Sequence, residues 1–204
     1  LSLAINYALG GTNVVGYHAL NLLLHLAVAL VLFGLVLRTL RLPPLKGPFQ
    51  DKARHIALAI TLIWTVHPLL TESVTFVIQR NELIVGLFYL VTLYSVLRSS
   101  SSARSALWYG CAIGACLLGM ASKEVMATAP VMVLLYDRAF LSGSFRKSLE
   151  QRRSLYLGLL ATWALLGLLI VSHHGRNQVV GFGHGVTGVA YALTQCQAIV
   201  HYLR

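Results

Sequence analysis

Residues able to bind phosphate and to move protons gather in two short polar motifs between apolar segments. The first motif, residues 67–82, contains His67, Glu72, Arg80 and Glu82. A carboxylate or an imidazole can take a proton from a hydroxyl, and a guanidinium binds phosphate through two parallel hydrogen bonds. This motif therefore predicts a site for a phosphorylated ligand, with His67 and Glu72 as candidate catalytic groups and Arg80 as a substrate-binding group. The alternative is structural: Arg80 pairs with Glu72 or Glu82 and anchors the loop.

The second motif is Ser122-Lys123-Glu124, which separates two apolar segments with almost no loop. If the two apolar segments span a membrane, charged side chains this close to the lipid are costly unless they are paired or used for function. Lysine binds phosphate as a compact point charge, so Lys123 is a candidate substrate-binding residue and Glu124 a candidate catalytic carboxylate. The alternative is an ion pair that only anchors the hairpin. Adjacent side chains point apart, so we expect Lys123 and Glu124 to have different partners.

A stripe of polar residues runs along the first apolar segment, at Tyr17, His18, Asn21 and His25. Spacings of three, four and seven residues place these side chains on one face of a helix. Lipid would penalise such a stripe, so we expect it to face the interior of a helix bundle. It either makes hydrogen bonds between helices or contributes His18 and Asn21 to substrate binding. His18 and His25 are separated by about 10.5 Å along the helix, too far to share a metal ion.

A further polar segment, residues 172–188, follows the last long apolar segment. Its histidines could bind a metal, but we favour a mobile polar loop that covers a site. Arg176 in this segment is a further candidate for substrate binding, and no metal ligand is assigned. The histidines are His173, His174 and His184. The sequence contains no Walker, GxSxG or HExxH motif, so ATP hydrolysis and the commoner membrane metalloprotease chemistries have no support.

Six apolar segments must position these polar groups. Apolar side chains make up 57% of the residues and charged ones 11%, with a mean hydropathy of +0.73, whereas ordinary globular chains carry about 25% charged residues. A helix needs about 20 residues to cross a bilayer, so the sequence predicts an all-α, polytopic transmembrane bundle of about six to seven spans. The seventh would be residues 191–204, as a span or a re-entrant helix. The six segments are residues 18–37, 55–71, 82–98, 106–121, 125–137 and 154–172. Residues 125–137 are short for a span, unless this segment begins near Ala121 or is buried.

Basic residues lie almost entirely in alternate connections between these segments. The connections after the first, third and fifth segments hold 12 of the 16 Lys and Arg residues. They are Arg38, Arg41, Lys46, Lys52, Arg54, Arg98, Arg104, Arg138, Arg146, Lys147, Arg152 and Arg153. Cytoplasmic loops concentrate Lys and Arg, so these connections are predicted to lie inside and both polar motifs outside. The outer cations are then Arg80, Lys123 and Arg176, with Arg204 if the last segment is re-entrant. The net charge of +10 fits contact with anionic lipid headgroups better than nucleic acid.

Four motifs, in this order, resemble the membrane portion of the transmembrane and tetratricopeptide-repeat (TMTC-like) O-mannosyltransferases and their bacterial relatives. This family lies within the GT-C class of glycosyltransferases, and the resemblance covers nearly the whole chain. The motifs are Asn6-Tyr7-Ala8-Leu9-Gly10-Gly11, then Tyr17-His18 with Asn21, Leu24 and His25, then His67-Pro68 with Thr71-Glu72-Ser73-Val74 and Arg80, then Ser122-Lys123-Glu124 with Pro130 and Tyr136-Asp137.

The resemblance implies an inverting enzyme that moves a sugar from a polyprenyl- or dolichyl-phosphate donor to an acceptor on the non-cytoplasmic face. The acceptor would be a protein hydroxyl or a glycolipid. The family's main acidic catalytic residue lies in the first outer loop, which places it upstream of Leu1. The candidate residues that carry over by position are His67, Glu72, Arg80, Lys123 and Glu124. No cofactor is assigned beyond the lipid-linked sugar, and dependence on a divalent metal is left open.

The chain begins at Leu1 and ends within an apolar pattern, so we expect residues 1–204 to be a partial GT-C-like transmembrane domain. The N-terminal span with the first outer loop, and any C-terminal repeat domain, would be missing. The expected partners are membrane lipids, the lipid-linked donor and the acceptor. The expected location is the bacterial cytoplasmic membrane rather than the endoplasmic reticulum, with the active face outward. The alternatives are a non-catalytic subunit of a larger membrane complex and a lipid or solute transporter. Inverted repeats or charges near mid-membrane would favour a transporter, and the sequence shows neither.

Overall fold

The computed structural model describes residues 2–45, 47, 49–173, 193–198 and 201. The chain divides into two compact units, residues 1–166 and residues 167–204. In the second unit, residues 167–173 end the last long helix and residues 193–198 are helical. The candidate catalytic and substrate-binding residues that can be placed all lie in the first unit.

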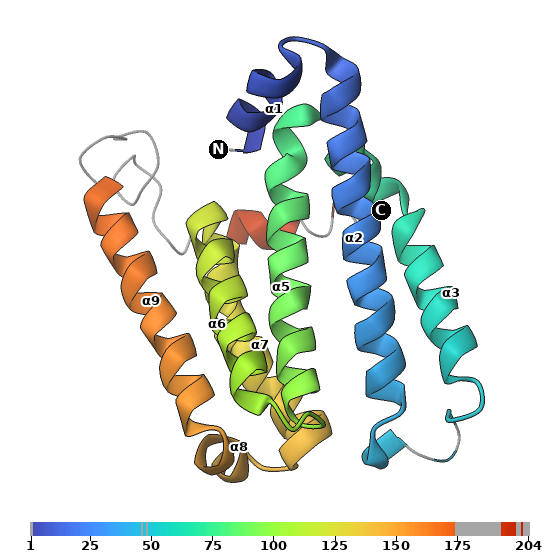
Figure 1. Cartoon of the computed structure of the whole chain (residues 1–204), viewed down its shortest axis with the longest axis vertical. Helices are drawn as coiled ribbons and strands as arrows, with labels where there is room; N and C mark the ends of the chain where they lie inside the picture. Colours follow the sequence, from blue (N-terminus) through green and yellow to red (C-terminus); the bar gives the residue numbers. More distant parts are fainter. Residues whose placement is uncertain (1, 46, 48, 174–192, 199–200, 202–204) are drawn as a thin grey trace. The chain divides into compact units, whose positions relative to one another are not determined.

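Helix α2 (Val14–Leu40) is the longest helix and follows the short helix α1 (Ser2–Gly10) (Figure 1). The Asn13 side chain caps its start by accepting a hydrogen bond from the Val15 amide at 3.1 Å. At its other end Arg38 lies in the last turn, where a cation is favoured by the helix dipole. Its 27 residues correspond to about 40 Å, more than the thickness of a bilayer core.

A break at Pro68 divides the apolar segment 55–71. Helix α3 (Ala53–Thr65) stops before His67, and η2 (Pro68–Leu70) and α4 (Thr71–Thr75) continue at an angle of 56° to it. Pro68 lacks an amide hydrogen and cannot continue the helical ladder, but it fits the first position of a new helical turn. The segment between Val66 and Thr75 is called the bent segment below.

The helical elements that follow, up to His173, include both long helices and short turns. They are η3 (Val77–Gln79), α5 (Arg80–Ser99), α6 (Ser105–Ser122), η4 (Glu124–Thr128), α7 (Ala129–Tyr136), the π-helix η5 (Asp137–Ser142), α8 (Phe145–Gln151) and α9 (Arg153–His173). The predicted segment 125–137 is therefore longer than expected, because η4 precedes α7 and η5 follows it. Gly143 ends η5 with a φ of 74°, a left-handed conformation that glycine adopts at low cost.

The predicted all-α membrane bundle is confirmed. Four helical segments are long and apolar enough to cross a membrane, and α3 with the bent segment would make a fifth. The helix Arg153–Leu168 is apolar but shorter. Each of the six predicted segments coincides with a helical stretch, and no strand occurs among the described residues. Most of the proposed seventh segment, residues 191–204, lies outside them. The chain is an integral membrane protein.

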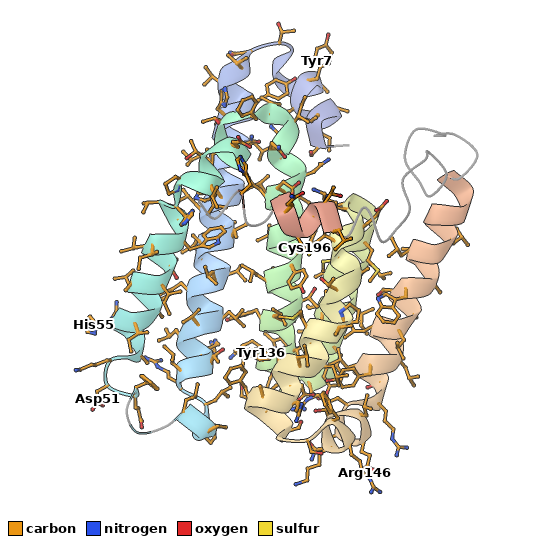
Figure 2. The ribbon with its side chains drawn as sticks, turned by 180° about the vertical axis from the view of Figure 1, so that it is seen from behind. Tyr7, Asp51, His55, Tyr136, Arg146 and Cys196 are labelled. Atoms are coloured by element: carbon orange, nitrogen blue, oxygen red, sulfur yellow. The ribbon has the colours of Figure 1, made fainter. Side chains whose placement is uncertain are left out.

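The two ends of the first unit differ in character. Three connections lie at the end marked by Asp51 and Arg146, and Tyr7 marks the opposite end (Figures 1 and 2). These connections, residues 41–52, 100–104 and 137–152, contain most of the basic residues described above, so this end is called the basic end and the other the charge-poor end. Helix α5 packs against both α2 and α6, and α2 also packs against α3.

A cluster of buried apolar side chains joins α5, α6, α7 and α9. The core includes Val96 of α5, Cys116 of α6, Val133 of α7 and Leu159 of α9, each fully buried. Helix α9 approaches α6 at Gly158, where a Cβ atom would lie 2.2 Å from the Ile113 side chain. Polar side chains are buried toward both ends. Toward the charge-poor end they include Asn6, Asn21, His25 and Arg80, and toward the basic end Ser99, Asp137 and Ser148.

Candidate functional site

Arg80 opens α5 and is fully buried at the charge-poor end. Its Nε donates a hydrogen bond to Asn21 Oδ1 at 2.7 Å, and its Nη1 and Nη2 donate to the carbonyls of Ser2 and Tyr17 at 3.3 and 3.1 Å. Its guanidinium carbon also lies 5.6 Å from the centre of the Tyr17 ring. The alternative prediction of an ion pair with Glu72 or Glu82 is wrong, because these neutral groups satisfy the guanidinium instead.

Asn21 connects this arginine to the bent segment. Its Nδ2 donates to the carbonyl oxygens of Val74 and Phe76, at 3.3 and 3.4 Å, while its Oδ1 accepts from Arg80. The Asn21 side-chain amide therefore links α2 both to α5 and to the end of α4, at Val74 and, just after the helix, Phe76. Asn21 and Arg80 were predicted separately as substrate-binding residues, and the structure brings them into direct contact.

The polar stripe on α2 is buried only in part. Asn21 is fully buried and His25 is 4% exposed, as predicted for a face turned into the bundle. His18 is exposed instead. Helix α3 covers His25 but ends at Thr65, so His18, two turns further along α2, lies beyond it. Sequence reasoning did not include His25 among the site residues, although its spacing of four from Asn21 placed it on the buried face.

Lys123 pairs with Glu82 rather than with Glu124. Glu82 lies in the first turn of α5, and Lys123 ends α6 with extended backbone, so the ion pair links these two helices. Both side chains are more than two-fifths exposed. Lys123 and its neighbour do have different surroundings, as predicted: Glu124 starts η4 and is exposed. The half-exposed ammonium can exchange its carboxylate partner for another anion without the cost of opening a buried site.

A pocket of about 300 Å³ lies between α2 and the bent segment. Helix α2 contributes His25 with apolar neighbours, and the other wall includes Thr65, His67 and Thr71. His67 also caps η2, because its Nδ1 accepts a hydrogen bond from the Leu69 amide at 3.3 Å. The pocket thus combines an apolar lining with two imidazoles.

One ring nitrogen of His25 makes no hydrogen bond to the described residues. Its Nε2 lies 3.0 Å from the Thr65 carbonyl, which can only accept, so Nε2 carries the hydrogen. The Nδ1 is then an acceptor in the neutral ring, and it is buried without a hydrogen-bond partner among the described residues. The ring also stacks on Trp64, with the ring centres 5.2 Å apart.

The other candidates are more scattered. Glu72 is exposed on α4 and, like Arg80 and Lys123, does not line the pocket beside His67. The structure therefore separates two groups, Lys123 with Glu82 and His67 with His25. The buried Arg80–Asn21 contact lies between them, because Arg80 shares the first turn of α5 with Glu82 and Asn21 bonds to the carbonyl of Val74, which lines the pocket. Candidates outside the described residues are Arg176, Arg204, His174 and His184. Within the described ranges, no group of three His, Cys, Asp or Glu side chains is arranged to hold a metal ion.

Neither a family model nor a solved structure matches the chain. Human protein O-mannosyl-transferase TMTC3 is 31% identical over 139 residues, which are 67% of this chain and 14% of that protein. Drosophila melanogaster Tmtc3 is 32% identical over 153 residues, covering 67% of this chain and 16% of its own length. Drosophila melanogaster Tmtc2 is 32% identical over 178 residues, with values of 84% and 18%.

The chain therefore spans less than a fifth of the length of these relatives. All three are animal proteins, so they give no support to the predicted bacterial location. Their names do agree with the family inferred from the four sequence motifs. The chain is an integral membrane protein related in sequence to the TMTC protein O-mannosyl-transferases.

Proposed function

We propose that this chain is part of a glycosyltransferase that moves a sugar from a lipid-phosphate donor to a hydroxyl group of an acceptor protein. The relatives, all named protein O-mannosyl-transferases, support a sugar as the group transferred and a protein as the acceptor. The observation that carries the proposal is the half-exposed Lys123–Glu82 pair at the charge-poor end. Of the ion pairs in the described part of the chain, it alone lies at that end.

Lys123 is the proposed phosphate-binding residue. A donor phosphate would replace Glu82 beside the ammonium, which suits a compact point charge on a flexible stem. In the reaction, the acceptor oxygen bonds to the anomeric carbon while the bond from that carbon to the phosphate oxygen breaks. The electron pair leaves with the lipid phosphate, and Lys123 stabilises the charge that develops there.

The hydroxyl proton passes to a carboxylate or an imidazole. Glu124, Glu72 and His67 are the proposed bases within this chain, since Glu124 adjoins Lys123 and His67 lines the pocket beside α2. The family resemblance implies a further acidic catalytic residue in the first outer loop, upstream of the position of Leu1. Among the other candidate substrate-binding residues, His18 is exposed and Arg176 lies outside the described residues.

Arg80 and Asn21 are proposed as positioning residues rather than direct ligands. The Arg80 guanidinium is fully buried and bonded to Asn21, Ser2 and Tyr17, so it fixes the first turn of α5. Glu82 lies on that same turn and holds Lys123. The buried contact would thereby set where the phosphate-binding lysine is placed.

A transfer assay tests the proposed function. The full-length protein in lipid nanodiscs, supplied with radiolabelled mannosyl-phosphoryl-dolichol and an acceptor protein, is expected to place label on the protein. The same protein supplied with a nucleotide-linked mannose is expected to transfer none. Human TMTC3 assayed in parallel controls for donor and acceptor quality. Label transferred only from the nucleotide sugar, or none from either donor while TMTC3 is active, would contradict the proposal.

A further inference from the structure

A second pocket lies at the basic end, far along the sequence from the residues considered above. It has a volume of about 440 Å³ and is formed by α8 and the first turns of α9. Arg146, Leu149 and Glu150 line it from α8, and Arg153, Tyr156, Leu157 and Leu160 line it from α9. Two guanidinium groups therefore share a cavity with three leucine side chains.

Two arginines and one acidic residue, Glu150, line this pocket, so cations outnumber carboxylates there. Residues 137–153 contain five basic and two acidic residues. One acid, Asp137, is already paired with Arg152 at 2.7 Å. The other, Glu150, contacts Arg146 Nε at 2.8 Å, but the Arg146 side chain is 86% exposed, so this pair is weak. Arg153 makes no ion pair within the part of the chain that the structure describes.

The pocket is built on a fixed framework. The Tyr156 hydroxyl donates to Asp137 Oδ2 at 2.8 Å, and Tyr156 also lines the pocket. Arg152 Nη1 donates both to Asp137 Oδ1 and to Ser142 Oγ, at 2.7 and 2.8 Å. These bonds connect η5, the residue after α8, and α9, so the two helices that form the pocket are held in place before a ligand arrives.

We propose that this pocket binds an anionic phospholipid from the leaflet that faces the basic end. Arg146 and Arg153 would bind the headgroup phosphate, because guanidinium groups match phosphate geometry. The acyl chains would then lie against Leu149, Leu157 and Leu160, which are 45%, 67% and 52% exposed. A soluble phosphate would leave those leucines uncovered, whereas a phospholipid meets both the charge and the apolar wall. This inference does not depend on the proposed enzyme activity.

Native mass spectrometry of the full-length protein tests this site. After reconstitution with phosphatidylglycerol and phosphatidylcholine, the wild type is expected to retain phosphatidylglycerol selectively. The double variant R146Q/R153Q is expected to bind it about 10- to 30-fold more weakly, from the contribution of about two surface cations. The matched control is R41Q/R104Q, which removes two exposed cations at the same end outside the pocket.

The control is expected to retain the lipid at close to the wild-type level. Thermal unfolding of both double variants should match that of the wild type, since all four arginines replaced are exposed. Equal losses in the two double variants would overturn the proposal in favour of diffuse attraction to the membrane. Equal retention of phosphatidylcholine, or displacement of the lipid by millimolar inorganic phosphate, would overturn it as well.

Discussion

Replacing Lys123 with alanine is expected to lower the rate of sugar transfer by about 100-fold or more while the protein stays folded. The ammonium is the proposed partner of the departing phosphate, and losing one such electrostatic contact typically costs two to three orders of magnitude in kcat. The side chain is 42% exposed and its pair with Glu82 lies at the surface, so the loss in folding free energy should be below about 1 kcal/mol. Initial rates with saturating lipid-linked donor, together with the melting temperature in the same nanodiscs, provide the two readouts.

Three further variants separate this role from a structural one. Lys123→Arg should recover part of the activity, because it keeps the charge. Arg80→Ala should lose activity and thermal stability together, since it leaves Asn21 and two carbonyls without a donor at a buried site. Arg104→Ala, at an exposed position of the basic end, serves as the control and should transfer sugar normally. Normal transfer by Lys123→Ala would remove that residue from the site.

Replacing Asp137 with alanine is expected to destabilise the protein by about 3–5 kcal/mol, the usual cost of removing one partner of a buried ion pair. The carboxylate is fully buried and accepts bonds from Arg152, Ser142 and Tyr156. Without it, the 11% exposed Arg152 loses its counter-charge, and the Tyr156 hydroxyl loses its acceptor. The melting temperature of the purified protein and its folded yield from the membrane measure the effect.

Glu150→Ala is the matched comparison, because it removes the carboxylate of an exposed ion pair only a short distance along the chain. Its cost should be below about 0.5 kcal/mol, as for other pairs four residues apart on a helix surface. Asp137→Asn should fall between the two, since an amide keeps an acceptor oxygen but not the charge. Equal melting temperatures for the two alanine variants would show that the Asp137 network does not hold α8 and α9 together.

The positions of the helices along the chain could largely be predicted from local features of the sequence. Each apolar segment became a helical stretch, and Pro68 produced the break expected of a residue without an amide hydrogen. The end of the segment 125–137 was harder to predict, because nothing in its sequence pattern indicated that the helix continues to Ser142. The π-helix begins at Asp137, whose partners Arg152 and Tyr156 lie 15 and 19 residues further on.

The candidate site shows the same division between local and distant information. The residue types at Arg80 and Lys123 marked them as important, but sequence proximity suggested the wrong partner for the arginine. Its acceptor is Asn21, 59 residues earlier, and Lys123 finds Glu82, 41 residues earlier. Such pairings depend on which helices become neighbours, and spacing along a single helix carries no information about that. The roles of these residues in sugar transfer are still predictions.

The central claim, that a lipid-linked donor binds with its phosphate beside Lys123, is tested most directly by photo-crosslinking. A dolichyl-phosphate-mannose analogue with a diazirine on its first isoprene unit would be irradiated with the full-length protein, and the adducts mapped by mass spectrometry. Our account predicts labelling near the end of α6 and in η4, suppressed by excess natural donor and by Lys123→Ala. Labelling confined to the basic end, or labelling near η4 that excess donor does not suppress, would contradict it.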